Sequence, residues 1–264
     1  MSSVVKRKFS INKNRLRILG LLYKFRYITI PLLQEYLGLK HPSTIWRTLQ
    51  SLEEENYVAN IYEKSYVKLS KPAHYFLDKK SLNYLKDQDG FNHSILHAYY
   101  KNKGITEETR QHYLDTFAAY NALRHSYNDS YYMFTKSELA SFDDFPENKP
   151  DLYLRRTNSQ GEYFITLAHD VQPFLIRKRL AEYIEHSEDE GWPTGEYPGL
   201  LFVLKNNTHE TQFLDYAEKV LDSAGISNDE LPVAVTTIKA LTQKPYTASI
   251  WTFLGDKTPS SLDE

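Results

Sequence analysis

The chain has 264 residues, 41% of them hydrophobic and 25% charged, which are the proportions of a folded globular protein with one large or two ordinary domains. We favour two domains. The absence of cysteine excludes disulfides, thiolate metal sites and a cysteine nucleophile. No apolar run approaches the ~20 residues that cross a bilayer, and the N-terminal segment lacks the apolar stretch of a signal peptide. We therefore expect a cytoplasmic protein without membrane contact.

The overall charge of -2 conceals an asymmetry between the two ends of the chain. Residues 1–86 hold 16 Lys or Arg against 6 Asp or Glu, a net charge of +10, whereas residues 87–264 hold 16 against 28, a net charge of -12. A basic half beside an acidic half indicates that one of them contacts a polyanion. The alternative is that the two halves attract each other.

The first two segments with a clear period are short helices. Apolar residues recur at helical spacing in residues 14–25 and predict the first helix. In the next segment, Thr29 is placed to cap a second helix, Pro31 suits its first turn and Gly38 suits its end.

Residues 41–58, with the sequence "HPSTIWRTLQSLEEENYV", predict a third helix whose buried stripe is Ile45, Leu49 and Leu52. Trp46 is expected in core or interdomain packing. Hydroxyls, an amide and one arginine near a helix N-terminus suit contacts with base edges and phosphates. These outward side chains, the first part of the candidate DNA-binding set, are Ser43, Thr44, Arg47, Gln50 and Ser51.

Two strand-like runs follow, residues 58–62 and 73–77, joined by a basic loop. Three short helices followed by such a hairpin resemble a winged helix-turn-helix domain, in which the loop would be the wing. The alternative is a three-helix module that binds protein. For DNA contact, we expect phosphates to be held by the wing and by the N-terminal arm, which supply Lys64, Lys68, Lys71, Lys6, Arg7, Lys8 and Lys13. The acidic run 53–55 would then point away from the DNA backbone.

A polar joint at residues 87–90 suggests two domains, residues 1–88 for DNA binding and residues 89–264 for a second domain. In the second domain, strand-like runs alternate with helical stretches at residues 173–187 and 209–224. The strand-like runs are residues 131–135, 151–156, 162–168, 200–205 and 234–241. This order is that of a restriction-endonuclease-like α/β domain with a mixed sheet, so the whole chain is expected to be of the α+β class.

The nuclease pattern is incomplete. Active members of that superfamily place an Asp at the start of the second strand and an acid-x-Lys on the third, because phosphodiester cleavage needs a divalent cation and an activated water. Asp151 matches the first part, but the third strand carries Thr166 and Ala168. Asp151 alone is interpreted as a turn or capping residue. We expect no catalysis and no cofactor, and an alternative metal set would be Asp151, Asp170 and Glu138.

Short motifs along nearly the whole chain carry a closer resemblance. They are "HYFLDKKSLNYL", "HYLDTFAAYNAL", "SEL", "KPDLYL", "RKRLAEYIEH", "GLLFVLKNN", "VTTIKAL" and "IWTFL". Together they resemble the replication-relaxation family, which joins a winged helix to a degraded nuclease-like domain and serves plasmid or mobile-element replication and conjugative transfer. The family usually has acids of the Glu-x-Asp kind on the third strand, where this chain has Thr166 and Ala168.

The resemblance implies a non-enzymatic protein that binds double-stranded DNA and acts in replication, transfer or their transcriptional control. Its partners would include relaxase or replication proteins, and a homodimer is an option. One alternative is a divergent Mg-dependent nuclease that uses Asp151 and Asp170, and another is a protein-only interaction module. The basic cluster at residues 177–179 either touches DNA or pairs with nearby acids, namely Glu185, Glu188 and Asp189.

Overall fold

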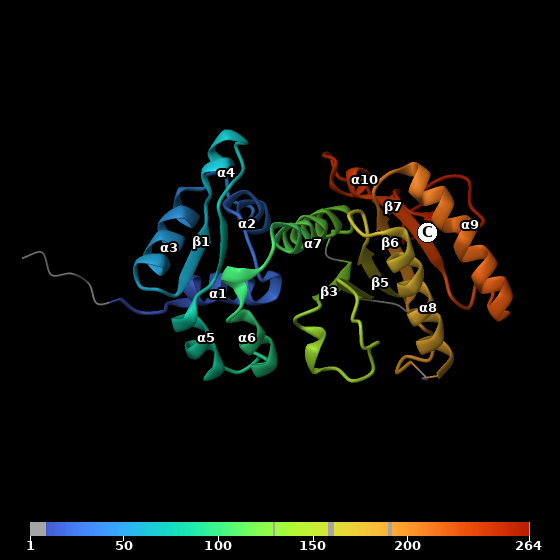
Figure 1. Cartoon of the computed structure of the whole chain (residues 1–264), viewed down its shortest axis with the longest axis horizontal. Helices are drawn as coiled ribbons and strands as arrows, with labels where there is room; N and C mark the ends of the chain where they lie inside the picture. Colours follow the sequence, from blue (N-terminus) through green and yellow to red (C-terminus); the bar gives the residue numbers. More distant parts are fainter. Residues whose placement is uncertain (1–8, 129, 158–160, 190–191, 264) are drawn as a thin grey trace, which may run out of the picture. The chain divides into compact units, whose positions relative to one another are not determined.

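The computed structural model describes residues 9–128, 130–157, 161–189 and 192–263, apart from the side chains of Lys64 and Asp189. The chain divides into two compact units, residues 1–105 and 106–264 (Figure 1). The division thus falls after residue 105, whereas the sequence suggested residue 88. The charge asymmetry survives this change, with 18 Lys or Arg against 8 Asp or Glu in the first unit and 14 against 26 in the second.

Three helices form the first part of the N-terminal unit, α1 (Lys13–Phe25), α2 (Ile30–Leu37) and α3 (Ser43–Glu54). The expected ends of α2 are confirmed: the Thr29 side chain accepts from the amide of Leu32, and Gly38 ends the helix with a φ of 64°, a conformation that suits glycine. The apolar stripes of the helices supply fully buried side chains to a shared core: Leu19, Leu22, Leu33, Ile45, Leu49 and Leu52.

An antiparallel hairpin follows α3, with β1 (Val58–Ile61) paired to β2 (His74–Leu77). Ile28, between α1 and α2, forms a bridge with Tyr75 on the other edge of β2. The expected open loop between the strands instead contains a short helix, α4 (Lys64–Lys68). Tyr66 explains the difference, because its buried ring packs against His74 and draws this segment onto the hairpin.

Residues 79–104 complete the N-terminal unit with α5 (Lys79–Lys86), α6 (His93–Tyr99) and a 3-10 turn (Asn102–Gly104). Asp78 caps α5 as expected. Residues after 88 stay in this unit because they bond to α1 and the turn after it. Tyr99 donates to the carbonyl of Tyr23, and Arg26 donates to the side chain of Asn102.

The C-terminal unit is built on a six-stranded mixed sheet in the order β3-β4-β5-β6-β7-β8. The strands β3, β4 and β5 are antiparallel neighbours, β5, β6 and β7 are parallel, and β8 is antiparallel to β7. The bounds are β3 (Tyr131–Thr135), β4 (Leu152–Arg156), β5 (Glu162–Leu167), β6 (Gly199–Leu204), β7 (Val233–Thr237) and β8 (Thr252–Phe253). A mixed sheet in an α+β chain is the fold class that the sequence predicts.

The helices of this unit are α7 (Glu107–Ser126), α8 (Pro173–Asp189), α9 (Asn207–Ala224) and α10 (Ile238–Thr242), with a 3-10 turn at Leu139–Ser141. Residues of α8 and α9 pack with one face of the sheet, where Phe164 and Phe202 lie, and α7 contacts β5. Every residue of β6 is buried, as in a strand covered on both faces. None of the described helices is both long enough and apolar enough to cross a membrane.

The strand expected at residues 234–241 is wrong in its second half, which forms α10. The Thr237 side chain ends β7 and caps the helix by accepting from the amide of Ala240. A run of β-branched residues that ends in a possible threonine cap is compatible with a longer strand and with a strand followed by a helix. The sequence pattern alone therefore did not place the boundary between β7 and α10.

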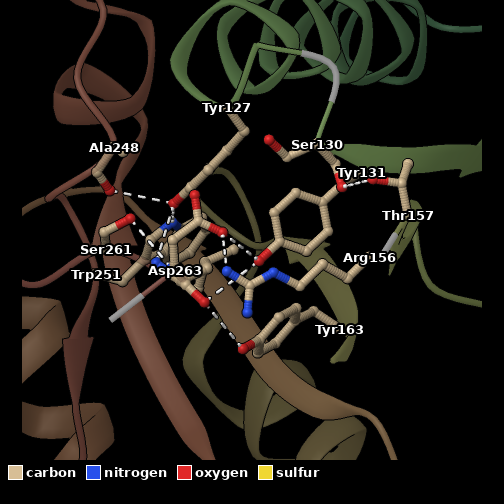
Figure 2. A network of polar contacts seen from close by, with 11 residues as sticks. Tyr127, Ser130, Tyr131, Arg156, Thr157, Tyr163, Ala248, Trp251, Ser261 and Asp263 are labelled. Atoms are coloured by element: carbon tan, nitrogen blue, oxygen red, sulfur yellow. Dashed lines mark hydrogen bonds and ion pairs between the residues drawn. The ribbon is translucent and has the colours of Figure 1, made fainter. Parts of the chain in front are cut away.

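The C-terminal segment is fastened by a tyrosine-centred network (Figure 2). The hydroxyl of Tyr127 accepts from the indole of the fully buried Trp251 at 3.1 Å and donates to the carbonyl of Ala248. Arg156 donates to Asp263 at 2.8 Å. Burial raises the pKa of Tyr127 to about 12, so this hydroxyl keeps its proton and its role as a donor at neutral pH.

Candidate functional site

The outward face of α3 carries most of the side chains that the sequence assigns to DNA. The exposed members are Ser43, Thr44, Arg47 and Gln50. Ser51 is a correction. It is half-buried, and its hydroxyl accepts from Nη2 of Arg15 at 2.8 Å, so it joins α3 to α1 instead of facing outward.

Trp46 is also exposed, and its expected place in the core is wrong: half of the side chain, 50%, is accessible. The helical spacing of Ile45, Leu49 and Leu52 already supplies the complete buried stripe, and position 46 lies off it. This spacing was the signal that would have placed Trp46 outside, next to Arg47.

The acids at the end of α3 are held away from its exposed first turns. Glu53 accepts from the side chain of Asn60 at 2.6 Å, and Glu55 pairs with Lys80 at 3.3 Å. At a rise of ~1.5 Å per residue, Thr44 and Glu54 are about 15 Å apart along the axis. This exceeds the ~8 Å Debye length at physiological salt, so the acids weakly affect an anion at the start of the helix.

The expected phosphate-binding residues differ in their exposure, and some of them are not described by the structure. Lys68 is exposed on α4, and Lys71 is half-buried with its ammonium 5.7 Å from the ring centre of Tyr66. Lys13 is exposed, but it begins α1 instead of belonging to an arm. Four members of the set lie outside the described residues or have side chains that are not described: Lys6, Arg7, Lys8 and Lys64.

The tip of the hairpin has a further feature that the sequence did not indicate. Tyr62, Val67 and Leu69 are exposed there, around Lys68. Because β1 and α4 are too short for a periodic pattern to define a buried face, the sequence did not predict that these three side chains are exposed.

In the C-terminal unit, Asp151 is not the simple turn residue that the sequence suggests. Its side chain is only 16% exposed, and one carboxylate oxygen lies 2.8 Å from Nε2 of His112. The other oxygen accepts from the amide of Leu167 at 2.8 Å. Asp151 therefore connects α7, the start of β4 and the end of β5.

His112 and Asp151 shift each other's pKa in opposite directions. Burial by itself would lower the pKa of His112, but the hydrogen bond to Asp151 and the charge of its carboxylate raise it above its ordinary value. Burial would raise the pKa of Asp151, yet the hydrogen bond and charge of His112 and the amide of Leu167 hold it below its ordinary value. Both shifts favour the charged pair.

A second His and Asp pair lies on the same helix face with the residue types exchanged. Asp115, three residues after His112 on α7, has Oδ2 at 2.9 Å from Nε2 of His169. The same nitrogen lies 3.3 Å from Oδ2 of Asp170. These three residues form a group of potential ligand atoms that all lie within 4.8 Å of one another.

The alternative metal set of Asp151, Asp170 and Glu138 does not form such a group among the described residues. Glu138 accepts from the amide of Thr135 and closes a turn. On the third strand, the Thr166 hydroxyl lies 3.0 Å from that of Tyr183, and Ala168 is buried. Neither of these two side chains supplies a carboxylate.

A pocket of about 270 Å³ lies where β5 and β6 end and α8 and α9 begin. His169 and Asp170 line it from the β5 side, and Lys205 and His209 line it from the β6 side. Arg177 also lines the pocket and lies over the ring of Tyr216, 4.8 Å from its centre.

The other two members of the basic cluster on α8 have acidic neighbours. Lys178 and Arg179 lie 3.6 Å and 3.9 Å from carboxylate oxygens of Glu182, which differs from the acids suggested by the sequence. These two side chains belong to an ion-paired helix face.

No protein-family model matches the chain, and a search of curated proteins finds no match. Among solved structures, the chain is similar to the restriction endonuclease FokI, at 14% identity and a TM-score of 0.32. The alignment covers 86% of this chain and 42% of the FokI chain.

Proposed function

We propose that this protein binds double-stranded DNA through its N-terminal unit, in the manner of the replication-relaxation proteins that its sequence resembles, and without cutting the DNA. The face of α3 is the observation that carries the proposal. Its first two turns expose Thr44, Arg47 and Gln50, whose donors and acceptors match base edges in a groove wide enough for a helix.

The order of elements supports this assignment. Three helices are followed by the hairpin of β1 and β2, and Ile28, between the first two helices, is bridged to β2. This order is the one expected of the winged helix-turn-helix domain that the sequence suggested. In that arrangement α3 enters the major groove, and the hairpin with Lys68 lies along the backbone.

The net charge of the N-terminal unit also supports DNA binding by this unit. Residues 1–105 carry a net charge of +10 from 18 Lys or Arg and 8 Asp or Glu. Release of counterions from neutralised phosphates supplies most of the non-specific affinity of such a unit. The C-terminal unit, with 14 Lys or Arg against 26 Asp or Glu, has a net charge that disfavours DNA binding. We therefore assign it to scaffolding or to contact with relaxase or replication proteins.

Two substitutions separate the two kinds of DNA contact. A preferred site is first selected from a random duplex pool, and binding to it and to a scrambled duplex is then followed by fluorescence anisotropy at several salt concentrations. Arg47→Ala should reduce the preference by about 1–3 kcal/mol. Lys68→Ala should weaken both duplexes alike and lower the salt slope by about 1.

The matched control is Lys219→Ala, which removes an exposed lysine from α9 in the other unit and should leave both affinities unchanged. If Arg47→Ala and Lys68→Ala lose specific and non-specific binding in the same ratio, the assignment of base and phosphate contacts is wrong. If neither duplex binds the unaltered protein, the DNA-binding proposal is wrong, and the protein-only interaction module is the alternative to test.

A further inference from the structure

We propose that Asp115, His169 and Asp170 form a binding site for a divalent transition-metal cation, with Zn²⁺ or Mn²⁺ as its ligand. The site joins α7 to the segment between β5 and α8, inside the C-terminal unit. It does not depend on DNA binding by the N-terminal unit, and it differs from the ligand set that the nuclease pattern suggested.

The three potential ligand atoms already have the spacing of a coordination shell. Nε2 of His169 lies 2.9 Å from Oδ2 of Asp115 and 3.3 Å from Oδ2 of Asp170. Metal bonds to nitrogen and carboxylate oxygen of ~2.0–2.2 Å place neighbouring ligands about 3 Å apart. The three atoms are therefore close enough to share one ion, which would take the place of the hydrogen bond between His169 and Asp115.

Two supporting contacts fix the ligands in place. Gln111 donates to Oδ1 of Asp115 at 2.8 Å, which leaves Oδ2 directed at His169. The amide of Ala168, immediately before His169, donates to the carbonyl of Val203 at 2.8 Å and holds this segment against β6. Such outer contacts orient the ligands of protein metal sites.

The charge and burial of the group point to a missing cation. Among the ion pairs of the described residues, neither Asp115 nor Asp170 is paired with a lysine or arginine. His169 is the shared partner of both, and its side chain is only 8% exposed. Two carboxylates thus lie beside one buried imidazole, which is their ion-pair partner among the described residues.

The donor set selects the kind of ion. Imidazole favours Zn²⁺ and similar transition metals, whereas carboxylates also suit Mn²⁺ and Mg²⁺, so one imidazole with two carboxylates favours Zn²⁺ or Mn²⁺ over Mg²⁺. Asp170 is 71% exposed and lines the 270 Å³ pocket with His169, which gives an ion a path from solvent and room for water ligands.

The test is isothermal titration of the EDTA-treated and dialysed full chain with ZnCl₂, MnCl₂ and MgCl₂. We expect one ion bound per chain for Zn²⁺ or Mn²⁺, with Mg²⁺ at least 10-fold weaker. Asp170→Asn and Asp115→Asn should each weaken binding by at least 10-fold, and Gln111→Ala should weaken it by about 10-fold. Asp143→Asn, at an exposed acid of the same unit, is the matched control and should bind as the unaltered protein does.

Asp170→Asn keeps the test decisive if the more buried variants fail to fold, because Asp170 is mostly exposed. Absence of a stoichiometric Zn²⁺ or Mn²⁺ site in the unaltered chain would overturn the proposal. It would also be overturned by Asp170→Asn binding with unchanged affinity, or by Asp143→Asn losing as much affinity as Asp170→Asn.

Discussion

His112 and Asp151 form the most informative residue pair of the C-terminal unit, because a residue interpreted from the sequence as a turn or capping residue joins three elements there. Asp151 is the residue that the sequence matched to the nuclease pattern, and both of its oxygens are engaged, one by His112 and the other by the amide of Leu167. The sequence identified the residue and the strand that follows it. It gave no sign of the partner, which lies 39 residues earlier in the chain.

This pair predicts a defined dependence of stability on pH. The pKa of His112 is raised above 6.5, so its charged pairing stabilises fully below pH 6.5 and is lost as the pH rises through the raised value. The pKa of Asp151 is lowered below 3.8, so its contribution is present above pH 3.8 and is lost as the pH falls through the lowered value. The pair therefore contributes most between pH 3.8 and 6.5.

Urea unfolding of the unaltered protein and Asp151→Asn from pH 3 to pH 9 measures this contribution. The difference in unfolding free energy between them should be largest inside that window and smaller on both sides. A difference that stays constant with pH would contradict the charged pair.

The contribution of Tyr127 to the stability of the C-terminal unit can be tested by a single substitution. Its hydroxyl contacts the indole of Trp251, the amide of Leu262 and the carbonyl of Ala248. Tyr127→Phe removes the hydrogen-bond partner of the buried Trp251 indole and of the Leu262 amide, and should cost about 1–3 kcal/mol of unfolding free energy. Tyr132→Phe, at a side chain that is 54% exposed, should cost less than about 0.5 kcal/mol in the same urea titration.

At the scale of elements, α3 allows a comparison of two serines, because Ser43 is exposed whereas Ser51 is half-buried and bonded to Arg15. Ser51→Ala removes the acceptor of Arg15 and should lower the unfolding free energy by about 0.5–1.5 kcal/mol without changing DNA affinity. Ser43→Ala, at an exposed position, should leave stability nearly unchanged and weaken DNA binding. Thermal melting and anisotropy of both variants check this, and the reverse pattern would contradict both assignments.

The elements that local chemistry defines were predictable. The cap at Thr29, the left-handed Gly38 and the cap at Asp78 fix helix ends through contacts within a few residues. In contrast, α4 depends on the packing of Tyr66 against His74, eight residues later, and no periodic pattern in the sequence predicts this helix. Short elements that need a distant contact were the ones that the sequence missed or misassigned.

For the whole molecule, the chain length and the polar joint at residues 87–90 indicated two domains, and the structure divides the chain after residue 105. The sequence did not reveal the group of Asp115 and His169, which are 54 residues apart and meet only because α7 contacts β5. Contacts between residues so far apart in the sequence can be predicted only when the strand order and register of the sheet are known. The structure provides both for β4, β5 and β6.

The two units predict that DNA binding survives separation of the N-terminal unit. A fragment of residues 1–105 keeps its own core and its net charge of +10. It should unfold cooperatively and bind duplex DNA with the salt slope of the full chain, as measured by circular dichroism and anisotropy. A folded fragment that fails to bind would place the DNA contacts in the C-terminal unit.

The most direct test of the central claim is an anisotropy titration of the full chain against a short duplex at several salt concentrations. If the N-terminal unit binds the phosphates of the DNA backbone, the logarithm of the association constant should fall linearly with the logarithm of the salt concentration. The slope should be about -0.9 for each neutralised phosphate. Absence of binding at low salt, or an affinity that does not change with salt, would contradict the account.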